Sequence, residues 1–170
     1  MKEVILYIAT SLDSYIATKD GSVDWLFSEG EYGYDEFYET IGTTLIGYNT
    51  YKEILGFGKF PYTDKTNYIF SMSHTKNDNN PVHFIAKDPV EFTANLKKEP
   101  GKDIWLVGGG QINTLLLNAG LIDRMILFIH PIILGDGIPL LGGMPKKSDF
   151  SLKQAKTFVN GVVEVEYEKK

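Results

Sequence analysis

The sequence predicts an α/β fold, in which a mostly parallel central sheet carries helices on both faces and ends in an antiparallel hairpin. Three observations lead to this prediction. Short apolar segments alternate with segments of helical periodicity, the order that crossover connections between parallel strands produce. Three glycines at positions 108–110 separate an apolar strand from a helix. The tail, residues 151–169, alternates in polarity around Asn160-Gly161, a dipeptide typical of hairpin turns.

The length and composition predict a single domain over residues 1–170. Hydrophobic residues make up 43% of the chain and charged residues 23%, an ordinary globular mixture. The net charge of −5 argues against a nucleic acid as partner. No apolar run approaches the ~20 residues that cross a membrane, and the start lacks a signal-peptide pattern. We therefore expect a soluble, cytoplasmic protein without a membrane partner.

Residue usage narrows the chemistry further. The chain has no cysteine, which excludes disulfides, thiolate catalysis and zinc–sulfur sites. Its histidines, His74, His83 and His130, show no metal-ligand spacing, so no metal site is expected. Arg124 is the only arginine, the residue that most often clamps carboxylates and phosphates. A bound ligand must therefore be held mainly by backbone amides, hydroxyls and lysines.

The first elements follow from their composition. Residues 4–10 are short, β-branched and aromatic, which predicts a buried strand. Residues 11–25 are polar, with Asp20-Gly21 as a turn. Apolar side chains at helical spacing predict a short amphipathic helix over residues 34–41.

The next elements repeat the alternation of strand and helix. A second strand is predicted at residues 43–47, followed by a helix at residues 49–55 that Asn49 or Thr50 can cap. A third strand is predicted at residues 66–73, where it stops among serines.

A short strand at residues 82–86 precedes a helix with a well-defined start. Asp88 occupies the N-cap position and Pro89 the first helical position of a helix over residues 88–98.

The glycine turn lies between a strand at residues 103–107 and a helix at residues 111–120, with Gly120 at its C-terminal end. Residues 124–134 then form one long strand, or two strands bent at Pro131.

The three glycines have two interpretations. They let the backbone approach a pyrophosphate at a helix N-terminus, or they only allow close packing of a strand on a helix. The standard dinucleotide fingerprint is incomplete, because Asn113 replaces its third glycine and Asp123 and Asp136 miss the acidic position. Small, hydroxyl and amide residues also follow the second and third strands, and parallel strands end at one edge of a sheet. The combination favours nucleotide binding.

Four motifs follow one another along the chain: "SLDSYIA" after the first strand, "IGYNTY", "VGGGQINTLLLNAGLID" and "HPIILGDGIPL". In this order they resemble the dihydrofolate-reductase-like fold, and within it the RibD C-terminal domain family of riboflavin biosynthesis reductases. The resemblance covers almost the whole chain.

The resemblance implies NADPH as the hydride donor, and it implies a set of cofactor-binding residues. For the pyrophosphate these are Gly108, Gly109, Gly110, Gln111 and Ile112, with Gly47, Asn49 and Thr50 at a second helix terminus. For the adenosine ribose and its 2′-phosphate they are Ser71, Ser73 and His74, with Lys76 nearby. For the nicotinamide they are Ala9, Asp13 and Ile16, on a mobile loop. Asp13 could instead close an Asx turn.

The chain departs from the substrate signatures of these relatives. Tyr48 stands where folate-type members usually have an arginine, and only Lys65 is available where they hold the folate tail. Gly108 occupies the place of an acid that is common in riboflavin-pathway members. The substrate is therefore left open.

Hydride transfer usually needs a nearby proton donor, and the folate-type mechanism suggests a carboxyl on the first helix. Asp35 is the expected catalytic residue, with Glu36 and Glu39 as rivals, although acids in a first helical turn also stabilise the helix dipole. Trp25 and Phe37 are candidates to stack on a flat substrate, with the core as their alternative.

These inferences together predict an NADPH-dependent reductase of a small heterocycle. The nearest family substrate is 5-amino-6-(5-phosphoribosylamino)uracil, and dihydrofolate is the alternative. A nucleotide-binding module without turnover is the alternative of another class, because the expected arginines are missing. The apolar segment at residues 125–134 also suggests a homodimer interface.

Overall fold

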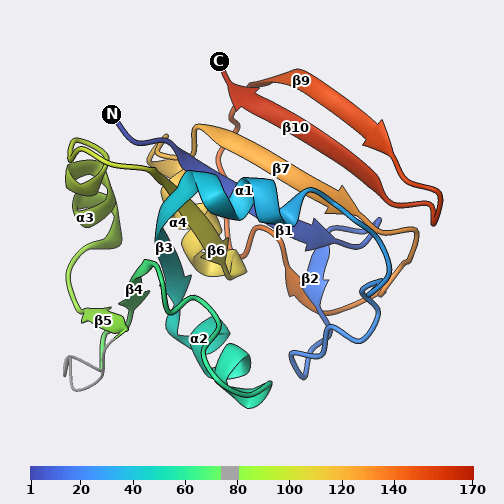
Figure 1. Cartoon of the computed structure of the whole chain (residues 1–170), viewed down its shortest axis with the longest axis horizontal. Helices are drawn as coiled ribbons and strands as arrows, with labels where there is room; N and C mark the ends of the chain where they lie inside the picture. The colour runs from blue at the N-terminus through green and yellow to red at the C-terminus, as the bar shows by residue number, and fades with distance from the viewer. Residues whose placement is uncertain (74–80) are drawn as a thin grey trace.

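The computed structural model describes residues 1–73 and 81–170. Within these residues, eight strands form one sheet in the order β5-β4-β3-β6-β1-β7-β10-β9, and β2 and β8 pair separately (Figure 1). The strands are β1 (Val4–Thr10), β2 (Tyr15–Ala17), β3 (Ile41–Gly47), β4 (Thr66–Phe70), β5 (Val82–Ile85), β6 (Asp103–Gly108), β7 (Arg124–Ile129), β8 (Ile138–Pro139), β9 (Phe150–Thr157) and β10 (Val163–Lys169). The helices are α1 (Tyr34–Thr40), α2 (Tyr48–Gly56), α3 (Pro89–Leu96) and α4 (Gly110–Asn118).

The sheet confirms the predicted fold class. Strands β5, β4, β3, β6, β1 and β7 run parallel, whereas β10 pairs antiparallel with β7 and with β9. The turn of the terminal hairpin contains Asn160-Gly161, as predicted, and the Gly161 amide donates to the Phe158 oxygen. Because the strands from β5 to β7 in the sheet order are parallel, they all end at the same edge of the sheet, where ligands bind in open α/β folds.

Helices cover both faces of the sheet. Alternate side chains of each central strand point to opposite faces, and apolar side chains on both faces need to be covered. Leu6 packs with Leu116 of α4 and Leu96 of α3 on one face. Ile5 packs with Phe37 of α1 on the other face. Figure 1 shows α1 and α4 on opposite sides of β1. Central strands that are buried on both faces explain the nearly continuous apolar runs in the sequence.

Two of the predicted helix ends are confirmed. Asp88 caps α3, because its carboxylate accepts hydrogen bonds from the backbone amides of Val90 at 2.8 Å and Glu91 at 3.4 Å. Gly120 follows α4 with a φ of 66°, and the amide of Leu121 donates to the Leu116 oxygen. This is the Schellman arrangement that a glycine permits.

Other predicted boundaries were wrong. Gly47, and not Asn49 or Thr50, is the N-cap of α2, which begins at Tyr48. The third strand ends at Phe70, before the serines. The segment at residues 124–134 contains one strand that ends at Ile129, before His130-Pro131.

The pairing of β2 with β8 was not predicted. Both strands are too short to show an alternating pattern, and they are far apart in the sequence. Among the helices of the described chain, none is long and apolar enough to cross a membrane.

Candidate functional site

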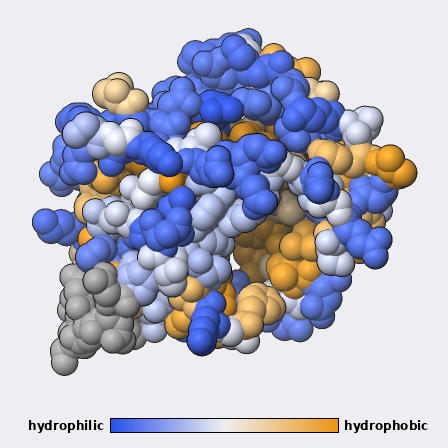
Figure 2. Space-filling view, viewed as in Figure 1, coloured by the Kyte–Doolittle hydropathy of each residue, from blue (hydrophilic) through white to orange (hydrophobic). Residues whose placement is uncertain are grey.

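A cavity of 1130 Å³ lies at the carboxyl edge of the sheet, beyond β1, β3, β4 and β6. Its wall includes the start of α2, the start of α4, the residues after β4, and parts of the segments at residues 16–23 and 137–143. Figure 2 shows a hydrophobic hollow between the regions of α2 and β2. The cavity thus joins segments from most of the chain length at the edge where a parallel sheet binds ligands.

Two helix N-termini meet in this cavity. The N-cap residues of α2 and α4 are Gly47 and Gly109, so neither helix has a capping side chain that accepts from the amides of its first turn. The two termini are close together, because a Cβ added at Gly47 would lie 3.5 Å from the Gly108 oxygen and 3.5 Å from the Gly109 nitrogen. The amides of a first helical turn have no partner within their own helix, so these amides and the positive ends of two helix dipoles make this corner of the cavity suitable for an anion.

The three glycines of the turn have different surroundings. Gly109 faces the cavity, and a Cβ there would lie 3.0 Å from Thr50 Oγ1. Gly108 does not line the cavity, and its φ of 111° is one that side chains rarely adopt. Gly110 lines the cavity, but a Cβ there would lie 2.2 Å from the Pro139 oxygen. The turn therefore combines close packing with an open approach at Gly109.

The loop after β1 is attached to the segment that follows β7. The Asp13 carboxylate accepts hydrogen bonds from the Ser11 hydroxyl at 2.6 Å and from the amides of Leu134 at 3.1 Å and Gly135 at 2.7 Å. The Ser11 hydrogen bond, followed by the backbone hydrogen bonds, holds the pKa of Asp13 below its usual range. Asp13 is thus turned away from the cavity and fixes the loop that carries Ile16 into it.

The structure brings most of the expected cofactor residues together. Those that line the cavity are Ile16, Gly47, Asn49, Thr50, Ser71, Ser73, Gly109, Gly110, Gln111 and Ile112. Three others do not line it: Ala9, which packs in the core, Asp13 and Gly108. His74 and the neighbouring Lys76 lie outside the described residues.

The expected catalytic acids are not brought to the cavity. Asp35, Glu36 and Glu39 are exposed on α1, and none of them lines the cavity, because α1 covers a face of the sheet instead of its edge.

The two aromatic candidates also lie outside the cavity. Phe37 is a core residue, stacked on Tyr7 with ring centroids 4.0 Å apart, so its expected contact with substrate is corrected to packing. Trp25 packs edge-on against His130 at 5.4 Å. Helical and aromatic patterns cannot by themselves separate a ligand contact from a core contact. Phe37 belongs to the core, whereas Trp25 is half-buried and lies outside the core clusters of the described residues.

Three charged residues of the wall were missed from the sequence: Lys19, Lys52 and Glu53. Burial raises the pKa of Glu53 above its usual range, and the Lys52 ammonium opposes this shift. The sequence does indicate that Glu53 could face the cavity. Glu53 follows Thr50 by three residues, and side chains three residues apart lie on one face of a helix. Among the described residues, no cluster of three side chains could hold a metal ion.

Comparison with known families agrees with this geometry. The model of the RibD C-terminal domain matches residues 2–164. The chain belongs to the RibD C-terminal domain family. Membership of this family supports the interpretation of the protein as a reductase. It also confirms the family that the four motifs indicated.

Relatives in sequence and structure extend along the whole chain. The uncharacterized protein YwjB of Bacillus subtilis (strain 168) is 39% identical over 95% of each chain. The uncharacterized protein YyaP of the same organism is 34% identical over 98% of this chain and 94% of its own. A crystal structure from Shewanella sp. PV-4, of a protein provisionally assigned to riboflavin biosynthesis, superposes with a TM-score of 0.87 at 27% identity, covering 99% of both chains.

A more distant structure shows the same fold. It is a diaminohydroxyphosphoribosylaminopyrimidine deaminase/5-amino-6-(5-phosphoribosylamino)uracil reductase from Thermotoga maritima, with a TM-score of 0.76 at 17% identity. The match covers 99% of this chain and 57% of that longer protein.

Proposed function

We propose that the protein is an NADPH-dependent reductase of a small heterocycle, with 5-amino-6-(5-phosphoribosylamino)uracil as the nearest family substrate. The observation that carries the proposal is the meeting of two glycine-capped helix N-termini in one cavity at the carboxyl edge of the sheet. Such a corner suits a pyrophosphate without any arginine, which matches the composition of the chain.

The residues of the cavity fit the proposed cofactor. The volume of 1130 Å³ exceeds that of a typical small-ligand pocket, ~300–1000 Å³, and leaves room for a dinucleotide with an acceptor. The bare backbone at Gly109 and the amides that begin α2 and α4 would hold the pyrophosphate. Ser71 and Ser73 offer hydroxyls at the end of β4 for the adenosine side, and Ile16 offers an apolar surface for the nicotinamide.

The chain contributes binding and exclusion of water, while the cofactor, when bound, supplies the hydride. Apolar side chains of the wall, including Ile16, Ile54 and Phe70, lower the polarity around a bound ring. A drier site strengthens each hydrogen bond that orients the acceptor. Dihydrofolate, the alternative acceptor, would use the same cavity.

A nucleotide-binding module without turnover is the second candidate, and one observation favours it. Arg124 does not line the cavity, because its guanidinium is engaged with Glu166 and with Glu3 at 3.4 Å. No arginine is thus available to clamp a phosphate of the acceptor.

Calorimetric titration with NADPH and, separately, with NADH tests the proposal. We expect micromolar binding of NADPH, about −8 kcal/mol, and weaker binding of NADH. Gly109→Val would fill the space beside Thr50 and should weaken NADPH binding at least tenfold, with an unchanged circular dichroism spectrum. Gly56→Ala, at an open position, is the matched control.

The possible results separate the candidates. If neither nucleotide binds, the glycine turn serves packing and the reductase proposal fails. If NADPH binds, turnover assays with the aminouracil phosphate and with dihydrofolate choose between the two substrates, and inactivity on both supports the module. The proposed homodimer is tested separately by light scattering of the purified protein.

A further inference from the structure

Glu53 is the only carboxylic acid among the described residues that line the cavity. It belongs to α2, and its carboxyl packs against the turn at Gly21, where an added Cβ would lie 2.9 Å from Glu53 Oε1. Gly21 has a φ of 83° and is buried, so the turn leaves room for the carboxyl by lacking a side chain.

This carboxyl has no partner within the described chain. No hydrogen bond or ion pair joins it to another described residue, although it is partly buried. A carboxylate that is partly removed from water, without a partner, costs stability unless another group donates a hydrogen bond to it. A titratable group that burial perturbs and that lines a cavity is a candidate for contact with a ligand.

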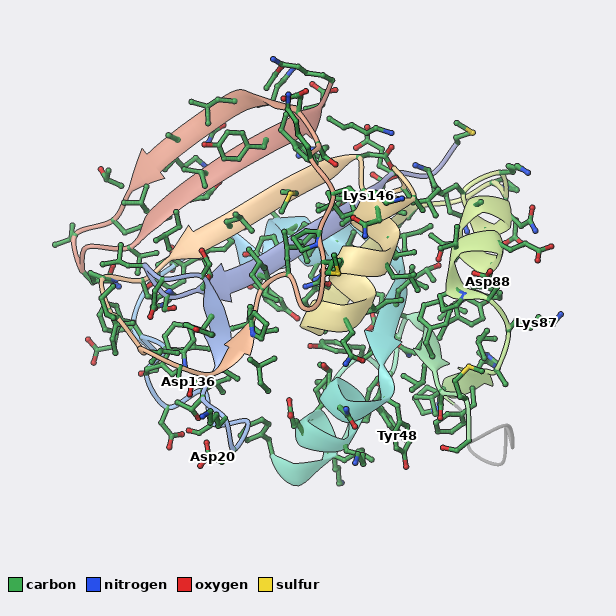
Figure 3. The ribbon with its side chains drawn as sticks, turned by 180° about the vertical axis from the view of Figure 1, so that it is seen from behind. Asp20, Tyr48, Lys87, Asp88, Asp136 and Lys146 are labelled. Carbon is green, nitrogen blue, oxygen red and sulfur yellow. The ribbon has the colours of Figure 1, made fainter. Side chains whose placement is uncertain are left out.

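Glu53 also lies in a suitable part of the cavity. Figure 3 shows Tyr48 on one side of α2 and Asp20 on the other. Asp20 precedes Gly21, so the side of Asp20 is the side of the turn that contacts Glu53. Ile54 and Phe57 are close to Glu53 in the sequence, and Val23 is close to Gly21. All three are apolar and line the cavity as well. A carboxyl among apolar walls can orient a flat polar ring.

We propose that Glu53 is the acceptor-binding carboxyl of this site, and that the acceptor ring presents adjacent N–H donors to it, as the amino groups of a diaminouracil do. The inference rests on the proposed function and adds to it the chemical group by which the acceptor is recognised. A carboxylate has two oxygens that accept neighbouring N–H donors side by side, and these charge-assisted hydrogen bonds are the stronger kind. A ring that offers only carbonyl oxygens at that edge would be repelled.

The charged groups around Glu53 set how recognition depends on pH. Burial raises the pKa of Glu53, and the ammonium of Lys52 on the same helix favours the ionised form. The turn packed against Glu53 carries Lys19, which is paired with Asp136, and Asp20, which is hydrogen-bonded within the turn. Because only the ionised carboxyl accepts two N–H donors, affinity for the diaminouracil group should fall as the pH falls through the raised pKa of Glu53.

The test uses 5,6-diaminouracil and uracil as probes, titrated by NMR against the full-length protein with and without NADPH. The proteins are the wild type, Glu53→Gln, which keeps the shape but removes the charge, and Glu31→Gln as an exposed control. We expect Glu53→Gln to weaken diaminouracil binding about tenfold or more, with little change in uracil binding. The pH dependence of diaminouracil binding should also disappear in this variant.

Each outcome decides the inference. Equal affinity of wild type and Glu53→Gln for diaminouracil, or an equal loss for both probes, overturns it, because the carboxyl would then serve only packing. A loss confined to diaminouracil supports it. The titrations without NADPH keep this result separate from the proposed function: if NADPH does not bind, the reductase proposal falls while the Glu53 measurement still stands.

Discussion

Gly110 is the position where a single methyl group has the most sharply defined effect. It is the first residue of α4, and a Cβ there would lie 2.2 Å from the Pro139 oxygen and 3.2 Å from the Gly142 nitrogen. Both contacts are with backbone atoms, which cannot rotate away. The Gly142 amide also donates to the Gly110 oxygen at 3.0 Å, so the two segments are already fastened together.

The magnitude follows from the distance. The contact with the Pro139 oxygen is ~1 Å short of ordinary van der Waals separation, so the segment at residues 137–143 must move. Overpacking of this kind costs about 1–3 kcal/mol. Alanine recovers up to about 1 kcal/mol relative to glycine in a helix. We therefore expect Gly110→Ala to lower the free energy of unfolding by about 1–2 kcal/mol, or Tm by about 2–8 °C.

Urea denaturation of wild type, Gly110→Ala and Gly56→Ala measures this. Gly56 ends α2, and a Cβ there meets nothing within 4 Å. The same substitution should therefore stabilise the protein at that position, by about 0.4–1 kcal/mol. If Gly110→Ala unfolds at the same urea concentration as wild type or above it, the 137–143 segment yields freely and the reasoning is refuted.

Three further predictions concern carboxylates. The pKa of Asp13 is lowered, so the ionised carboxylate stabilises the folded protein at neutral pH, and this stabilisation is lost as the pH falls through that pKa. Asp13→Asn should remove this pH dependence of stability. It should also speed hydrogen exchange at the amides of Leu134 and Gly135. The pKa of Glu53 is raised, so the stability of the protein falls as the pH rises through that pKa. Glu53→Gln should therefore raise Tm at neutral pH and leave Tm unchanged below the unfolded pKa of about 4.3. Scanning calorimetry at both pH values measures this. Asp88→Ala should lower the free energy of unfolding by about 1 kcal/mol through loss of the α3 cap, and an unchanged urea midpoint would contradict this.

Local signals explain why the main elements could be predicted. The cap at Asp88, the Asn160-Gly161 turn and the apolar run of β1 each depend on residues close together in the sequence. Parallel pairing then followed from the alternation of strands with helices. The corner of the cavity where α2 and α4 begin could be predicted for the same reason, because Gly47 and Gly109 lie between a strand and the helix that follows it.

The missed features depend on contacts between distant segments. Pairing of β2 with β8 joins residues more than a hundred positions apart and leaves no local pattern. The helical spacing that includes Phe37 marks an apolar face, but only the fold shows that this face covers the sheet. Glu53 becomes notable only once the turn at Gly21 packs against it.

The central position of β1 has a consequence for biosynthesis. Its register partners are Ile104 to Leu106 of β6 on one side and Arg124 to Ile129 of β7 on the other. One edge of this apolar strand therefore stays open until β6 has left the ribosome, and the other edge until β7 has left it. Such non-local pairing makes folding slow and exposes strand edges to association with other chains. A nascent chain that stalls between α1 and α4 would therefore be a substrate for chaperones, and truncations before residue 129 should collect in the insoluble fraction of the cell.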